Sequence, residues 1–291
     1  MKKLILFFTI VFFTTKVMSQ SKLASGSIMP STLLQKDISY SIYLPDGYDQ
    51  EGDMEYPVVY LLNGFTGDET DWTHKATMQP IVDNLVASHK IKKMVIVMPD
   101  GDDRLYMNKE DGTYPFEDML IKEFVPYIER TYKIKKDRTS RSISGLSMGG
   151  AGALRLALKY HTLFGACAAY SSALFTEKEV IQMDSKFFED YFGNVIVSMK
   201  EKKGKDRITP YYKEYDVLHL VKTKNPELLK NVRIYFDCGD DDFLSIGNSL
   251  LHIELRMLQI PHEYRVRDGE HNFDFWKESL RNGLQFMDAD K

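Results

Sequence analysis

The stretch SGLSMGGAG at residues 144–152 constrains the fold more than any other part of this chain. It holds four glycines, two serines and no charged residue, in a chain that is 27% charged. The segment before it has the pattern of a short strand, and the segment after it (148–160) has the pattern of a helix. A Gly-x-Ser-x-Gly motif in this setting is typical of a nucleophile elbow, a sharp turn that exposes a strained serine. The alternative is a tight turn that happens to contain serine.

The residue types around Ser147 favour the nucleophile. A side chain two residues before or after it would collide with neighbouring backbone, which explains Gly145 and Gly149. The first turn of the following helix presents free N–H groups, so the Met148 N–H can bind a developing oxyanion. A phosphate-binding loop fits less well, because the Lys-Ser/Thr pair is missing and the glycine spacing is not that of a dinucleotide site.

Strand and helix patterns alternate along the chain. Continuous apolar runs predict strands buried on both faces, and one alternating run predicts a half-buried strand. The predicted strands are residues 38–44, 56–64, 93–101, 141–145, 164–172, 231–239 and 262–269. The predicted helices are residues 79–88, 116–132 (with Pro126 as a point of kinking), 148–160, 245–258 and 273–286. This order predicts an α/β fold with a mostly parallel central sheet and helices on both faces.

Residues 174–230 interrupt the alternation, because they separate two predicted strands by far more than one crossover needs. We expect a helical and loop insert that forms a cap or a wall of the substrate site. Its charge run KEKKGKDR (200–207) is expected to be a solvated loop.

The first nineteen residues have the layout of a secretory signal peptide. Two lysines form a basic start, and an apolar run of twelve residues (4–15) follows. Spanning a bilayer takes about twenty apolar residues, so this run is too short for a membrane anchor. We therefore expect a signal peptide at residues 1–19, one α/β domain at residues 20–291, and export to the periplasm or the medium.

Charge and cysteine content exclude several classes of function. Removing the signal peptide takes away three lysines and no acid, which moves the formal charge from −4 to −7. Such a chain is a poor partner for nucleic acid or anionic membranes. Two cysteines are too few for a disulfide-built domain and have no zinc-site spacing. We expect Cys167 and Cys238 to be free thiols, because they fall at different levels of neighbouring strands.

A serine nucleophile needs a base and an acid, and in this fold class they follow in the order serine, acid, histidine. His271 lies between the last predicted strand and the last predicted helix, where a loop can reach the serine. The acid is expected after the preceding strand, where the loop offers Asp240, Asp241 and Asp242. Spacing alone does not choose among these three aspartates.

The chain resembles the esterase family that contains esterase D, feruloyl and acetylxylan esterases of carbohydrate esterase family 1, enterochelin esterases and mycolyltransferases. The stretches that carry the resemblance run through nearly the whole mature chain. They are SIYLPDGYD (41–49), YPVVYLLNGFTGDETDW (56–72), MVIVMPDG (94–101), RSISGLSMGGAGALRLAL (141–158), DCGDDDFL (237–244) and GEHNFDFW (269–276).

The resemblance implies an α/β-hydrolase fold and a Ser-His-Asp site. It implies Ser147 as nucleophile, His271 as base and Asp242 as acid, since the family's acid is the third residue after the glycine of its Cys-Gly motif. It also places a second oxyanion donor just after the Asn-Gly pair, at the Phe65 N–H. Feruloyl-type members usually have His-Gly where this chain has Asn63-Gly64. Because the donors are backbone groups, we expect the chemistry to survive this difference.

Export and the resemblance together predict a serine carboxylic-ester hydrolase without cofactor or metal, acting on feruloyl or acetyl esters of plant cell-wall carbohydrate. Its partner is a small-molecule or oligosaccharide ester, and its oligomeric state is left open. Trp72, Tyr106, Tyr211 and Tyr212 are candidate surfaces for a sugar or a phenolic acid, with packing as the alternative for each. The alternative functions are a siderophore esterase, an acyltransferase with the same triad and, as the weakest, a non-catalytic binding protein.

Overall fold

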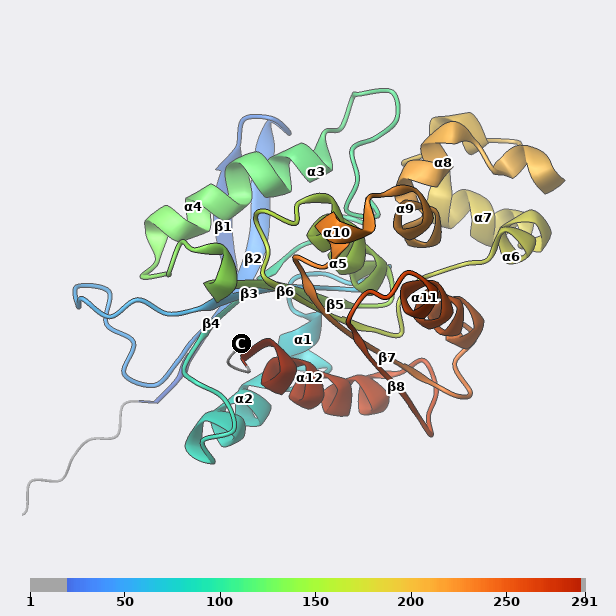
Figure 1. Ribbon diagram of the computed structural model, residues 1–291. Coiled ribbons are helices and arrows are strands. Elements are labelled where there is room, and N and C mark those ends of the chain that lie inside the picture. The colour runs from blue at the N-terminus through green and yellow to red at the C-terminus, as the bar shows by residue number, and fades with distance from the viewer. Residues whose placement is uncertain (1–19, 289–291) are drawn as a thin grey trace, which may run out of the picture.

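The chain builds one central sheet of eight strands, in the order β1-β2-β4-β3-β5-β6-β7-β8 (Figure 1). The computed structural model describes residues 20–288, so the predicted signal peptide lies outside the described residues. β1 pairs antiparallel with β2, and β2 with β4, whereas every pair from β4 to β8 is parallel. The predicted α/β fold with a mostly parallel sheet is therefore confirmed.

The strands in the middle of the sheet are buried along their whole length, as their continuous apolar sequences predict. The eight strands are β1 (Lys22–Ser31), β2 (Lys36–Leu44), β3 (Val58–Leu62), β4 (Val95–Pro99), β5 (Arg141–Leu146), β6 (Ala166–Tyr170), β7 (Arg233–Gly239) and β8 (Glu263–Arg267). The sequence patterns did not predict β1. It is a largely exposed edge strand with a register shift between Ala24 and Ser27, so it has neither the alternating nor the continuous apolar pattern.

Helices cover both faces of the sheet (Figure 1). The main ones are α1 (Asp71–His74), α2 (Met78–Ala87), α3 (Phe116–Asp118), α4 (Val125–Thr131), α5 (Met148–Lys159), α11 (Ser245–Met257) and α12 (Phe273–Asp288). One apolar cluster joins α2 and α12 to one face of the sheet, and a second joins α4, α5 and α11 to the other. Within residues 20–288, no helix is both long enough and apolar enough to cross a membrane.

The predicted helix over residues 116–132 is interrupted by a π-helical segment (Met119–Phe124) between α3 and α4. This segment lies just before Pro126, which has no N–H and whose ring would clash with the carbonyl four residues earlier in an α-helix. The wider π turn avoids that clash, and the Val125 N–H bonds the Leu120 carbonyl.

The insert over residues 174–230 is mostly helical and lies beside the carboxyl ends of the strands (Figure 1). Its helices are α6 (Glu177–Gln182), α7 (Ser185–Phe192), α8 (Pro210–Tyr215), α9 (Val217–Thr223) and α10 (Pro226–Leu229), with 3-10 turns at Val197–Met199 and Gly204–Arg207. The sequence sets these boundaries through N-cap side chains, including a Thr176–Glu179 capping box on α6 and Asp184 on α7.

The end of the charge run 200–207 differs from the prediction of a solvated loop. Arg207 is 3% exposed, and its guanidinium lies 3.9 Å from the ring centroid of Phe188. The same group donates hydrogen bonds to the carbonyls of Val180 and Met183. Burial of this charge is tolerated because carbonyl oxygens and an aromatic face replace its water. Arg207 therefore ties its 3-10 turn to α6 and α7.

Both cysteines are free and buried, as predicted. Cys167 on β6 pairs in register with Ile234 on β7, which is four residues before Cys238. Four residues along a strand amount to about 13 Å, which is beyond the reach of a disulfide. Burial also raises the pKa of both thiols, so they are poor nucleophiles in the folded protein.

We predict that the purified protein contains two thiols and no disulfide. Titration with a thiol reagent in denaturant, without prior reduction, should give two thiols per chain. The native protein should react far more slowly, because both sulfur atoms are buried. A count of zero in denaturant would contradict the register of β6 and β7.

Candidate active site

Ser147 occupies the turn between β5 and α5 in a strained backbone conformation. Its φ is 53° and its ψ is −117°, which an L-residue rarely adopts and which costs about 1–3 kcal/mol. Hydrogen bonds hold it there: its N–H donates to the Tyr170 carbonyl and its carbonyl accepts from the Ala173 N–H, each over 2.9 Å. The end of β6 and the residues after it thus fix the backbone of Ser147.

The two glycines of the motif are required by backbone contacts. A Cβ atom at Gly145 would lie 2.5 Å from the Gly149 carbonyl oxygen, and a Cβ atom at Gly149 would lie 2.5 Å from the Asn63 carbonyl oxygen. Backbone cannot move away as a flexible side chain can, so no other residue fits at either position. The collision expected from the sequence is therefore present on both sides of Ser147.

Three side chains from three loops form a continuous hydrogen-bonded chain at the carboxyl edge of the sheet. His271 Nε2 lies 3.0 Å from Ser147 Oγ, and His271 Nδ1 lies 2.8 Å from Asp242 Oδ2. The imidazole ring packs between Phe243, at 4.7 Å between centroids, and Trp276, at 4.8 Å and almost perpendicular. These two rings restrict the rotation of His271 about its side-chain bonds.

Of the three candidate aspartates, Asp242 is the one that contacts the histidine. It is 1% exposed, whereas Asp240 and Asp241 are exposed. Its second oxygen accepts from the Leu244 N–H over 2.9 Å. Burial alone would raise the pKa of Asp242, but the hydrogen bonds from His271 and Leu244 outweigh it and hold that pKa below its usual value. The carboxylate is therefore ionised at neutral pH.

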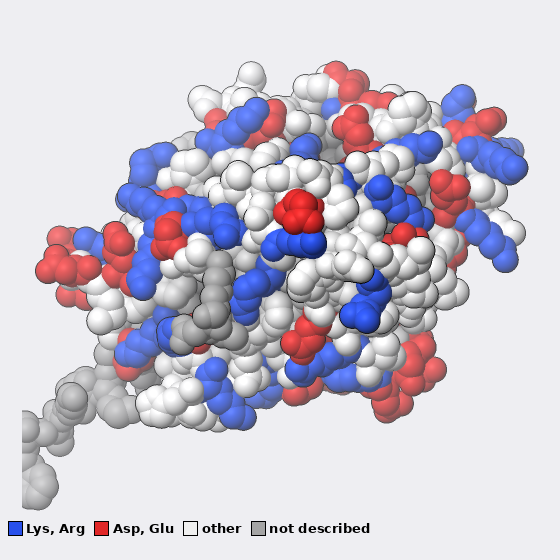
Figure 2. All heavy atoms as spheres, in the orientation of Figure 1, with Lys and Arg blue, Asp and Glu red and all other residues white. Residues whose placement is uncertain are grey.

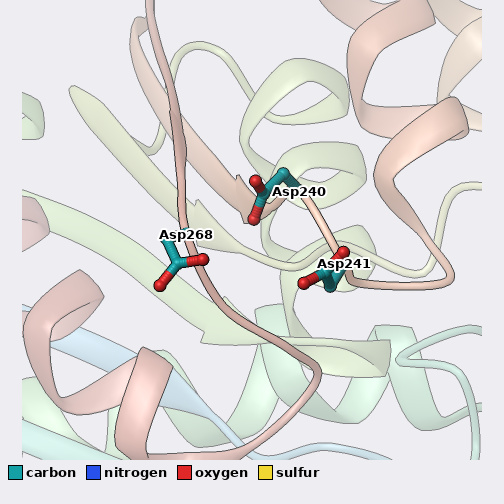
Figure 3. Close-up of side chains that lie close together, drawn as sticks. All are labelled: Asp240, Asp241 and Asp268. Atoms are coloured by element: carbon teal, nitrogen blue, oxygen red, sulfur yellow. The ribbon is translucent and has the colours of Figure 1, made fainter.

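The neighbouring acids Asp240, Asp241 and Asp268 form an exposed carboxylate cluster (Figure 3), with one oxygen of each within 4.8 Å of the others. Hard cations such as Ca²⁺ take about six to eight oxygen ligands, of which this cluster would supply only a part. Asp240 already accepts a hydrogen bond from the Gly269 N–H over 3.1 Å. That bond fixes the loop that carries His271, so the geometry itself gives Asp240 a structural role.

Two backbone N–H groups belong to segments that lie next to the serine. Met148 is the first residue of α5, so its N–H has no acceptor within the helix. A Cβ atom at Gly64 would lie 3.5 Å from Ser147 Cβ, so the segment that contains Phe65 passes next to the serine. Among the described residues, no hydrogen bond from the Phe65 N–H is found. Both groups can therefore donate to an oxyanion on an acyl carbon bound to Ser147.

Three of the four aromatic residues proposed as substrate contacts are buried, so the prediction is wrong for them. Trp72 and Tyr106 are 0% exposed and Tyr212 is 1% exposed. The Trp72 indole donates to the Leu62 carbonyl, and the Tyr106 hydroxyl bonds Asn63. Tyr211 is partly buried, with its hydroxyl on the Asn108 carbonyl. The polar groups of Trp72, Tyr106 and Tyr211 thus form hydrogen bonds within the protein, which is typical of packed aromatic residues.

An apolar groove next to the histidine was missed in the sequence. Its volume is about 310 Å³, and it is lined by Phe175, Glu179, Gln182, Met183, Phe187 and Phe243. Phe243 is 62% exposed and Phe187 is 39% exposed, so both rings face solvent across the groove. The position of Phe243 directly after Asp242 was the only signal available, because the other residues come from the insert.

Aromatic contacts connect the residues that line the groove to the site on two sides. On one side, Phe243 contacts the His271 ring. On the other, Phe175 and Phe187 both pack on Tyr191, which contacts the Phe65 ring at 5.1 Å. Ring contacts therefore link the groove to His271 on one side and to Phe65 on the other.

The sheet order and a serine at a strained strand-to-helix turn define an enzyme of the α/β-hydrolase class. Residues 31–287 match the family described as Putative esterase, and the chain belongs to this family. The esterase activity and the α/β-hydrolase fold expected from the sequence are thereby confirmed.

Known relatives act on acetyl and feruloyl esters. An acetyl esterase of Caldicellulosiruptor saccharolyticus is 28% identical over 88% of this chain and 95% of its own length. An endo-1,4-beta-xylanase/feruloyl esterase of Xylanibacter ruminicola is 34% identical over 48% of this chain, which corresponds to 20% of that longer protein. The solved structure of a ferulic acid esterase is similar, with a TM-score of 0.78 at 29% identity over 93% of this chain and 98% of its own.

We predict that Ser147→Ala abolishes ester hydrolysis without unfolding the protein. Loss of a nucleophile leaves only the catalysis given by binding and the oxyanion donors, so about 1% or less of the wild-type kcat should remain. Initial rates on a nitrophenyl acetate would measure this. Ser88→Ala, which removes an exposed hydroxyl at the end of α2, should keep full activity. Retention of several per cent by the Ser147 variant would exclude this serine.

We also predict a single acid limb in the pH dependence of kcat/KM. Histidine is the side chain whose charge ordinarily changes between about pH 5 and pH 8, and only the neutral ring can accept the serine proton. The pKa of Asp242 is held below its usual value, so protonation of this carboxylate should not contribute to this limb. Rates measured from pH 4 to pH 9 would test this, and a flat profile would argue against a histidine base.

Proposed function

We propose that Ser147, His271 and Asp242 hydrolyse a carboxylic ester through an acyl-enzyme. Ser147 Oγ attacks the acyl carbon while His271 Nε2 takes its proton, and the N–H groups of Met148 and Phe65 bind the oxyanion. His271 then gives the proton to the leaving alcohol, and the acyl group stays on the serine. A water molecule repeats the sequence and releases the acid, while Asp242 holds the imidazole and stabilises its charged form.

The observation that carries this proposal is the chain of contacts from acid to nucleophile. The distances of 2.8 Å and 3.0 Å lie within hydrogen-bond range, and the serine is the strained residue at the start of α5. A serine that donates to a base, itself held by a buried carboxylate, is the arrangement required to activate a weak nucleophile.

We propose that the substrates are feruloyl or acetyl esters of plant cell-wall carbohydrate. The names of the relatives support both acyl groups. The groove supports the aromatic one, because four of its six lining residues are phenylalanine or methionine. Its lining includes no Lys or Arg. An anionic catecholate siderophore, the competing substrate, would lack a charge partner there.

We further propose that the protein is exported and that residues 20–291 form a single esterase domain. A carbohydrate ester outside the cell requires export, and the proposed signal peptide would supply it. Acidic and basic side chains are interspersed over the face seen in Figure 2, without one large basic patch. This distribution supports a small-molecule or oligosaccharide partner and not nucleic acid.

The substrate class is tested by comparing catalytic efficiencies. We expect feruloylated or acetylated xylo-oligosaccharides to be hydrolysed at least tenfold more efficiently than a catecholate trilactone. A preference of about a hundredfold for the trilactone, equivalent to about 2.7 kcal/mol of transition-state binding, would overturn the carbohydrate substrate and leave the esterase intact.

The groove gives a second prediction. Phe187→Ala should lower kcat/KM for a feruloyl ester about tenfold, since losing an aromatic contact costs about 1–2 kcal/mol. The acetyl ester, which is too short to reach α7, should change by less than about twofold. Leu228→Ala, at an exposed apolar residue elsewhere in the insert, should leave both rates unchanged. Equal losses for the two esters would contradict a role of the groove in acyl selection.

A further inference from the structure

Building on the proposed role of the Phe65 N–H as an oxyanion donor, we propose that the loop at residues 101–106 positions this donor. Tyr106 and Asp103 are its positioning residues. Neither contacts the reacting atoms. Each holds the backbone on one side of Phe65, the first through Asn63 and the second through Thr66.

Before Phe65, the loop controls the Asn63 side chain. The Tyr106 hydroxyl donates to Asn63 Oδ1 over 2.8 Å, and the Gly101 N–H donates to the same oxygen over 3.0 Å. This fixes the amide so that its Nδ2 donates to the Gly64 carbonyl over 3.0 Å. Both partners are buried, with Asn63 at 1% exposure and Tyr106 at 0%, so a substrate cannot reach them.

The Gly64 carbonyl and the Phe65 N–H belong to one peptide group. A peptide group is planar and trans, so its carbonyl and its N–H point in opposite directions. Fixing the carbonyl with the Asn63 amide therefore fixes the direction of the Phe65 N–H. The Gly67 N–H also donates to the Gly64 carbonyl, over 3.2 Å, which leaves this oxygen with two donors.

After Phe65, the loop holds the next peptide group. Asp103 Oδ1 accepts from the Thr66 N–H over 2.7 Å. Thr66 has a φ of 63°, in the left-handed region that costs free energy for a β-branched residue. A charged acceptor on its N–H offsets part of this cost. Phe65 thus lies between two anchored peptide groups, and both anchors come from residues 101–106.

Four residues of the loop hold strained backbone conformations. Asp102, Asp103, Leu105 and Tyr106 all have a positive φ, between 46° and 53°. Residues remain in this region only where the surroundings determine their conformation, and such clusters gather at functional sites. The strained residues include Asp103 and Tyr106, whose side chains hold the backbone on the two sides of Phe65.

A buried ion pair connects the loop to α5. Arg155, 1% exposed, donates to the Tyr106 carbonyl and pairs with Glu117 over 2.5 Å. The Tyr106 ring packs on the same helix, where a Cβ atom at Gly152 would lie 2.7 Å from it. The helix α5 also carries the Met148 N–H. The positions of both proposed oxyanion donors therefore depend on this one helix.

The test compares Tyr106→Phe and Asp103→Ala with matched controls. Removing a whole oxyanion donor lowers kcat about 10²- to 10³-fold, so a donor that is present but loosened should cost about 10- to 100-fold. We expect kcat to fall by this factor with KM within twofold. Affinity for a boronic acid that forms a tetrahedral adduct with the serine should fall by the same factor. Asp103→Asn, which keeps an oxygen acceptor, should recover most of the loss.

The controls separate positioning from structural damage. Tyr60→Phe removes another buried tyrosine hydroxyl, which has no partner among the described residues, from β3, the strand that leads to Asn63. Asp137→Ala removes a carboxylate that accepts a backbone N–H at the opposite end of β5. Both should keep wild-type kcat. If Tyr106→Phe does not fold, the Asp103 variants alone decide the result.

Two results would overturn the positioning role. One is a kcat within twofold of wild type for Asp103→Ala and for any folded Tyr106→Phe, while Ser147→Ala is inactive. The other is a loss of activity in which boronic acid affinity does not change. Activity retained by Ser147→Ala would instead remove the proposed function itself, so the two failures are distinguishable.

Discussion

The strained turn at Ser147 is the constraint on which the rest of the site depends. Its backbone costs about 1–3 kcal/mol, and hydrogen bonds to the end of β6 and the helical bonding of α5 offset this cost. The turn can form only where neighbouring backbone approaches closely, and this approach excludes any side chain at Gly145 and Gly149. The close approach of β3, β5 and α5 is therefore a requirement of the turn at Ser147 as well as of the core.

The parallel sheet supplies the other two groups without further strain. Parallel strands place their carboxyl ends at one edge, so the loops after β7 and β8 meet the turn after β5. Asp242 and His271 come from these loops, with β6 between β5 and β7 carrying the backbone contacts of Ser147. The order of the strands thus explains why Asp242, His271 and Ser147 are far apart in sequence and adjacent in space.

Local patterns predicted most of this arrangement, and tertiary packing decided the rest. Ser147 and His271 follow from a motif and from chain order, which are properties of short segments. Spacing alone does not show which of three adjacent carboxylates turns inward, so Asp242 was predicted only through the family resemblance at the Cys-Gly motif, and in the structure it is the buried one. A sequence does not distinguish an aromatic residue that packs in the core from one that contacts a substrate, which is why Trp72, Tyr106 and Tyr212 are candidates for either role from the sequence and are buried in the structure.

Asn63 stands where feruloyl-type members of the family usually have histidine, and the hydrogen bonds of Asn63 explain this difference physically. An amide side chain offers an oxygen with two lone pairs and an NH₂ group, whereas neutral imidazole offers one acceptor and one donor. Asn63 uses both lone pairs, for the Gly101 N–H and the Tyr106 hydroxyl, and still donates to the Gly64 carbonyl. A histidine could accept only one of the two donors, and the other would remain buried without a partner. The asparagine and the tyrosine are therefore matched to each other, because the side chain at position 63 must satisfy the two donors of the loop at residues 101–106.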